Sequence, residues 1–117
     1  MFNDTSTPLS LLTTRRSGKP RDLVAPGPSP EQLEQMIAIA ARTPDHGKLA
    51  PWRFVIVDDR AALATLITDA YRAERPQAAR TEIESLEQFA HQAPALVVVL
   101  SSPSTTSHIP RWEQELS

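Results

Sequence analysis

Apolar residues recur with the spacing of amphipathic helices in the first half of this 117-residue chain. An N-cap at Thr7, followed by a first-turn proline, predicts a short helix over 8–16 that Gly18 can end. The sequence of Ser29–Gln32 has the form of a capping box with proline at the first helical position. The apolar stripe that follows consists of Leu33, Met36, Ile37, Ala40 and Ala41. We therefore expect a second helix that starts after the capping box and is stopped by Pro44.

Three more helices are predicted in the second half of the chain. Asp58 or Asp59 can cap the first of these helices, which follows the apolar run at residues 52–57. Its apolar stripe consists of Leu63, Leu66, Ile67, Ala70 and Tyr71. The next helix spans residues 79–91, and its carboxylates fall on the polar face, where the solvated interpretation is preferred. A last helix starts at Pro110.

Two apolar, β-rich runs predict strands, at Trp52–Val57 and Ala95–Ser101. Both runs carry apolar side chains on both faces, which is typical of strands inside a sheet. The Pro/Gly-rich residues 19–28 and the Ser/Thr/Pro residues 101–107 are predicted as loops. Two strands alone form only a marginal sheet. We therefore expect a single domain over residues 1–117 that a second subunit or a further C-terminal part completes.

The composition fits one soluble globular domain and argues against several function classes. Lys and Arg number 12 against 14 Asp and Glu, so the net charge of -2 gives no basic field for nucleic acid. Because cysteine is absent, disulfides, thiol nucleophiles and Cys-based metal sites are excluded, and the three histidines are too scattered for a metal site. No dinucleotide-binding, phosphate-loop or Gly-x-Ser-x-Gly motif is present. The N-terminus does not resemble a secretory signal, and no apolar run reaches the roughly 18 residues of a membrane helix, so we expect a cytoplasmic protein.

Arg15, Arg16 and Ser17 place two guanidinium groups and a hydroxyl within three residues. Such a set suits a phosphate or a polyol chain, because guanidinium groups form charge-assisted hydrogen bonds with phosphate oxygens. Alternatively, the arginines only interact with the dipole of a helix C-terminus, which is worth about 0.3–1 kcal/mol each. Spacing alone leaves both interpretations open.

The segment Ala41–Trp52, with the sequence ARTPDHGKLAPW, is a second polar cluster. Its prolines each fix one φ angle and Gly47 permits a conformation that other residues resist, so the loop can hold a defined shape. His46 and Lys48 can hydrogen-bond to a heterocycle, and Arg42 or Lys48 can stabilise a negative charge that develops on it. The alternative is a solvated connection between helix and strand, in which His46 only caps a carbonyl.

A third cluster, Arg111–Glu115, has an aromatic residue between charges, which is more often a packing anchor than a catalytic element, and we expect this anchor at a subunit interface. Together and in this order, the clusters resemble the N-terminal part of the nitroreductase family of flavin enzymes. The resemblance rests on a short helix ending in Arg15–Ser17, an amphipathic helix running into Arg42–His46, a Pro-Trp pair opening a strand, and Pro110–Gln114. The Pro-Asp-His and Arg-Trp-Glu-Gln strings are similar to the compact bacterial NAD(P)H nitroreductase branch.

This resemblance implies an α+β fold, with an antiparallel-dominated sheet flanked by helices, and an intertwined homodimer with FMN at the subunit interface. It implies a ping-pong cycle in which NAD(P)H reduces the flavin, which then reduces a nitroaromatic, a quinone or a similar acceptor. By family position, Arg15, Arg16 and Ser17 hold the FMN phosphate and ribityl chain, and Arg42 and His46 contact the cofactor from the loop. No protein residue then needs to act as a nucleophile.

The chain departs from the family pattern in two ways. Many members carry Ser, Asn and Gln in the loop before Pro-Trp, whereas this chain has Asp45, His46, Lys48 and Ala50, so a glutamine contact at the place of Ala50 is lost. The family also continues past this point with further strands, a Gly-rich segment and late basic residues. The alternative function is a non-catalytic dimerisation or ligand-binding module, or an inactive fragment of the same scaffold.

Overall fold

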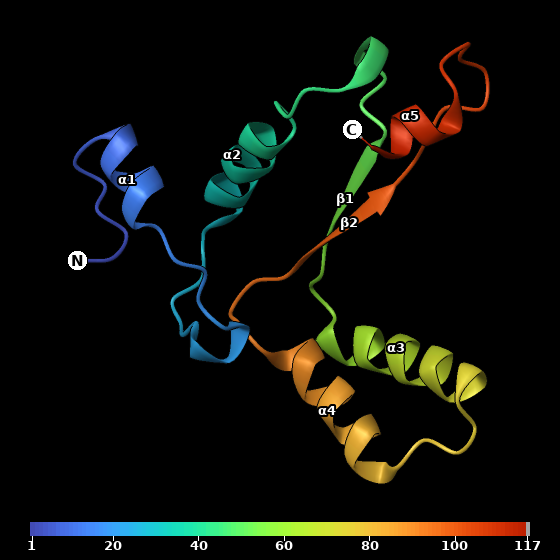
Figure 1. The fold of residues 1–117 in the computed structure, drawn as a ribbon. Helices are drawn as coiled ribbons and strands as arrows, with labels where there is room; N and C mark the ends of the chain where they lie inside the picture. The colour runs from blue at the N-terminus through green and yellow to red at the C-terminus, as the bar shows by residue number, and fades with distance from the viewer. Residues whose placement is uncertain (117) are drawn as a thin grey trace.

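The computed structural model of this chain contains a small antiparallel sheet with helices on both of its sides (Figure 1). The structure describes residues 1–116, except for the side chain of His46. In these residues the elements are α1 (Pro8–Thr14), the 3-10 helix η1 (Pro20–Asp22), α2 (Pro30–Ala40), the 3-10 helix η2 (His46–Lys48), β1 (Trp52–Ile56), α3 (Arg60–Glu74), α4 (Arg80–His91), β2 (Val97–Ser101) and α5 (Arg111–Glu115). The predicted α+β fold class is confirmed.

The predicted N-caps are present in the structure. The hydroxyl of Thr7 accepts a hydrogen bond from the Ser10 N–H at 3.0 Å, and Ser29 and Gln32 form both hydrogen bonds of the capping box. Asp59, rather than Asp58, caps α3 by accepting from the Ala62 N–H. Each cap joins residues three apart in the chain, which is why the local sequence was sufficient to predict it.

The end of α1 differs from the prediction, because the helix stops at Thr14 and not at residue 16. Arg15 is extended, with φ -62° and ψ 142°, and the Arg16 N–H donates to the side-chain oxygen of Asn3 at 2.9 Å. The Arg16 N–H is therefore bound by the N-terminal segment and does not form the hydrogen bond that would extend α1. Residues 19–28, predicted as an irregular loop, contain the short η1 turn, which begins at Pro20 because proline suits a first helical position.

The two strands form an antiparallel pair, although α3 and α4 lie between them in the chain, with Phe54 opposite Val99 and Val55 opposite Val98. The apolar stripe of α2 lies along a groove of about 230 Å³ on one face of this sheet, and the start of α3 lines a groove on the other face. Each strand has a neighbour on one edge within the described chain. The prediction that both strands lie inside a sheet is therefore not met here, and Val99 stays 59% exposed.

Helices α3 and α4 pack against each other as a helical hairpin. Its small core is formed by Ala64, Thr68, Ile83 and Ala90, all buried. The Arg60 guanidinium donates to the carbonyls of Ala90 at 2.9 Å, Gln92 at 3.1 Å and Ala93 at 3.2 Å. These carbonyls lie at the end of α4, where the helix leaves acceptors without partners. Arg60 thus ties the first turn of α3 to the end of α4, next to both strands.

The molecule is open, and much apolar surface is uncovered. Its accessible surface is 9394 Å² and its radius of gyration 17.8 Å. A compact monomer of 12.9 kDa would expose about 6,300 Å² and have a radius of gyration of about 13 Å. The exposed large apolar residues include Leu9, Leu12, Val24, Met36, Ile39, Leu66, Val99, Trp112 and Leu116. Such surfaces are typical of elements that pack against further protein.

Among the described residues, no helix combines the length and the apolar character needed to cross a bilayer. The cytoplasmic location stays a prediction from the sequence.

Candidate functional site

The loop that joins α2 to β1 has an unusual backbone. Within it, Gly47, Lys48 and Ala50 adopt positive φ angles of 76°, 53° and 45°. This left-handed conformation costs a residue other than glycine about 1–2 kcal/mol. The surrounding structure must therefore hold Lys48 and Ala50 in it. Part of that support is local, because the Leu49 N–H donates to the carboxylate of Asp45 at 2.8 Å. Such strained residues are concentrated at ligand-binding and active sites, which makes this loop the first candidate.

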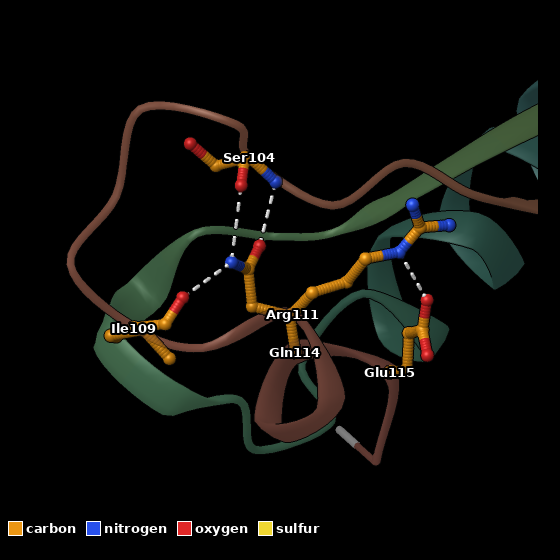
Figure 2. Close-up of polar contacts among 5 residues, drawn as sticks. All are labelled: Ser104, Ile109, Arg111, Gln114 and Glu115. Carbon is orange, nitrogen blue, oxygen red and sulfur yellow. Dashed lines mark hydrogen bonds and ion pairs between the residues drawn. The ribbon is translucent and has the colours of Figure 1, made fainter.

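A second loop, residues 102–110, is held by the buried side chain of Gln114 (Figure 2). The Gln114 side-chain oxygen accepts from the Ser104 N–H at 2.6 Å. Its side-chain nitrogen donates to the carbonyl of Ser104 at 3.2 Å and to that of Ile109 at 2.9 Å. One glutamine therefore fixes both ends of the loop, using its donor and acceptor groups together.

The two loops touch at Gly47 and Ile109. A Cβ atom placed on Gly47 would overlap the Cδ1 atom of Ile109, so the isoleucine side chain lies directly over the glycine. A further link is the Ser102 N–H, which donates to the carbonyl of the buried Pro51 at 2.6 Å. Glycine at position 47 is thus required both by its φ angle and by its neighbour.

Arg42 and His46 belong to this region. Arg42 is exposed and lies immediately after the C-cap of α2, and its N–H donates to the carbonyl of Ile39. The backbone of His46 begins η2, but its side chain lies outside the described residues. Its predicted contact with a ligand therefore stays a prediction.

Arg15, Arg16 and Ser17 are exposed on the segment that follows α1, which is extended at Arg15. The Arg15 guanidinium donates to the Ser17 hydroxyl at 3.5 Å. The Arg16 guanidinium lies over the ring of Phe2, 4.0 Å from its centroid, in a cation–π contact. The three side chains are therefore gathered on one short segment that anionic ligands can reach.

The N-terminal segment folds back on the end of α1 and supports this segment. Asn3 and Asp4 donate through their N–H groups to the carbonyl and the hydroxyl of Thr14, at 3.1 and 2.9 Å. The carboxylate of Asp4 accepts from the Ser6 N–H, and this hydrogen bond lowers the pKa of Asp4. The shape of the segment at Arg16 therefore depends on residues near the chain start.

The two groups of predicted residues lie at opposite ends of α2 within one chain (Figure 1). Arg15–Ser17 precede α2 in the chain, and Arg42 follows the C-cap of this helix. A helix of 11 residues spans about 16 Å. A ligand that contacts both groups in one chain must therefore be elongated, with an anionic end and a distant second end.

The sequence did not predict the role of α5. Trp112 was expected to be a packing anchor, but it is 62% exposed in this chain, whereas Gln114 is 2% exposed. Packing by Trp112 at a subunit interface stays a prediction. The only sequence signal for Gln114 was its place in the Arg-Trp-Glu-Gln string, which does not show where its amide group points.

An antiparallel sheet between helices, with the polar segments in this order, is consistent with an α+β fold of the nitroreductase type. A sequence model of the nitroreductase family matches residues 12–115, and the chain belongs to this family. The predicted resemblance is thereby confirmed.

Two curated relatives are similar to the chain over most of its length. One, named "Putative NAD(P)H nitroreductase", from Haemophilus influenzae, is 39% identical over 112 residues, which are 93% of this chain and 59% of the relative. "Putative NAD(P)H nitroreductase YdjA" of Escherichia coli K12 is 31% identical over 112 residues, 93% of this chain and 58% of the relative. The chain thus spans about three fifths of the length of these relatives.

Proposed function

We propose that this chain is part of an FMN-dependent oxidoreductase that passes a hydride from NAD(P)H, through the flavin, to a nitroaromatic, a quinone or a similar acceptor. The observation that carries the proposal is the match to the nitroreductase family over residues 12–115. The names of the two relatives agree with NAD(P)H as the electron donor. The acceptor class and the ping-pong order come from the family resemblance.

The residues at the end of α1 fit the phosphate end of FMN. Arg15 and Arg16 provide guanidinium donors, Ser17 provides a hydroxyl, and all three are exposed on the segment that follows α1. A phosphate dianion needs several charge-assisted donors of this kind. The stacking of Arg16 on Phe2 limits the orientations of the guanidinium group before any ligand binds.

The loop after α2 fits the ring end of the same molecule. Its strained backbone at Gly47–Ala50 is braced by the 102–110 loop, so it can present donors in fixed positions. FMN, when bound, supplies the hydride chemistry. Arg42 would stabilise negative charge on the ring, and His46 would contact the cofactor from the loop. The role of the protein is therefore to bind and orient, and no residue of the chain is assigned as a nucleophile.

We also propose a homodimer with FMN at the subunit interface. The accessible surface of 9394 Å² exceeds that of a compact monomer by about half. Apolar surface of this extent is stabilised when a second copy or further chain covers it. A shared site would also allow one FMN to contact segments that lie at opposite ends of α2 in a single chain.

Anaerobic spectroscopy of the purified protein tests the proposed function. We expect the protein to bind FMN and to show flavin absorbance that NADH or NADPH bleaches and that an added quinone restores. The control is free FMN with the same nicotinamide and no protein. Colourless protein that gains no flavin absorbance with added FMN would contradict the proposal and favour a non-catalytic dimerisation or ligand-binding module.

A further inference from the structure

We propose that Gln114 is a positioning residue that sets the conformation of the Asp45–Ala50 loop from a distance. It acts through the neighbouring 102–110 loop, by way of Ile109 and Gly47. The naming of Asp45–Ala50 as a flavin-binding loop rests on the proposed function, but the link between the loops rests on the structure alone. Neither the family match nor the names of the relatives assigns a role to this glutamine.

The burial of Gln114 shows that it is directed at the loop and not at solvent. It is 2% exposed on a helix of five residues, and neighbouring Trp112 and Glu115 are exposed. Burying an amide is costly unless its polar atoms are hydrogen-bonded. The three hydrogen bonds of its side-chain amide go to the backbone of the 102–110 loop, at Ser104 and Ile109 (Figure 2). The amide group therefore fixes the backbone of this loop.

Ile109 links the 102–110 loop to the Asp45–Ala50 loop. Its carbonyl is held by Gln114, and its N–H donates to the Ser107 hydroxyl at 3.1 Å, so the backbone on both sides of its side chain is fixed. The side chain then lies over Gly47. If Ile109 moves, Gly47 loses the neighbour that covers it.

The second loop depends on such a support because of its backbone. Lys48 and Ala50 keep their left-handed conformation only where surrounding contacts hold them in it. The Asp45 carboxylate and the Leu49 N–H make a local hydrogen bond, but this bond alone does not fix the position of Gly47. The contact with Ile109 supplies the missing restraint from outside the loop.

Amide hydrogen exchange of the full chain without FMN tests this link. In Gln114→Ala we expect exchange to accelerate at Ser104, which loses its acceptor, and roughly fivefold at Leu49, which Gln114 does not touch. The matched control is Glu115→Gln, which removes the ion pair with Arg111 on the same helix and should leave Leu49 unchanged. Faster exchange at Ser104 with unchanged exchange at Leu49 would overturn the proposal.

The variant Gln114→Glu distinguishes hydrogen-bond donation by the Gln114 amide from the packing of its side chain, because glutamate has nearly the same size. The introduced carboxylate keeps an acceptor for the Ser104 N–H but cannot donate to the carbonyls of Ser104 and Ile109. We expect exchange at Leu49 to accelerate as in Gln114→Ala. If exchange at Leu49 stays at the wild-type rate in this variant, the amide donor is not what positions Ile109.

FMN titration then links the loop to the proposed function. We expect Gln114→Ala to weaken FMN binding by roughly fivefold, as measured by quenching of flavin fluorescence. Gly47→Ala, which disturbs the same contact from the other side, should weaken it similarly. Wild-type protein that does not bind FMN would refute the proposed function, and the exchange rates would still decide the role of Gln114. Unchanged FMN affinity in both variants, beside normal binding by the wild type, would overturn the functional part of the inference.

Discussion

Replacing Arg16 with alanine is expected to weaken FMN binding about 10- to 150-fold. A hydrogen bond to a charged group contributes about 1.5–3 kcal/mol, and the phosphate of FMN would lose one such donor. The guanidinium is exposed and already stacked on Phe2, so its removal should leave the helices intact. Titration of the full chain with FMN, followed by flavin fluorescence, gives the affinity.

The control for this variant is Arg72→Ala. Arg72 is an exposed arginine of α3 that pairs with Asp69 at 3.6 Å, and it lies outside the candidate site. Its replacement removes the same charge from the protein but should leave FMN affinity unchanged. If Arg16→Ala binds FMN as tightly as the wild type, the assignment of the phosphate to the end of α1 is wrong.

Replacing Arg60 with alanine is expected to lower the free energy of unfolding by about 1.5–3 kcal/mol, because a charged donor to buried or half-buried carbonyls is lost. The Arg60 guanidinium donates to three carbonyls at the end of α4, among them that of Ala93, which has a positive φ of 62°. Urea unfolding followed by circular dichroism measures the effect.

Arg72→Ala serves again as the control, since its exposed ion pair should contribute less than about 1 kcal/mol. Arg60→Lys should recover part of the lost stability, because an ammonium group can reach one or two of the carbonyls but lacks the planar fork. Equal unfolding free energies for Arg60→Ala and Arg72→Ala would show that Arg60 does not hold the α3–α4 hairpin.

The features that the sequence predicted well depend on residues near one another in the chain. The caps at Thr7, Ser29 and Asp59 join residues three apart, and the apolar stripes of α2 and α3 follow the helical period. The strands were found because apolar β-branched residues are concentrated in two runs. Local chemistry was sufficient for these elements.

The features that the sequence did not predict depend on distant residues. The end of α1 is set by Asn3, thirteen residues before the amide it binds. The left-handed conformation of Lys48 and Ala50 has no local signal, because neither residue favours it. The burial of Gln114 depends on its hydrogen bonds with Ser104, ten residues earlier. Pairwise contacts of this kind cannot be read from one sequence.

The candidate site shows the same division. The sequence and the family resemblance selected Arg15, Arg16, Ser17, Arg42 and His46 as residue types able to hold an anionic, flat cofactor. The structure places the first three on one exposed segment and Arg42 beside the strained loop. Their joint contact with FMN stays a prediction, because it depends on a ligand and on further protein.

The most direct test of the central claim is an FMN titration of isotope-labelled protein, followed by the backbone amide signals in NMR spectra. If one FMN molecule contacts both segments, the amides of Arg15–Ser17 and those of Arg42–Gly47 will shift together and saturate with a single dissociation constant. Shifts confined to one segment, or two different dissociation constants, would contradict the claim that both segments hold the same cofactor.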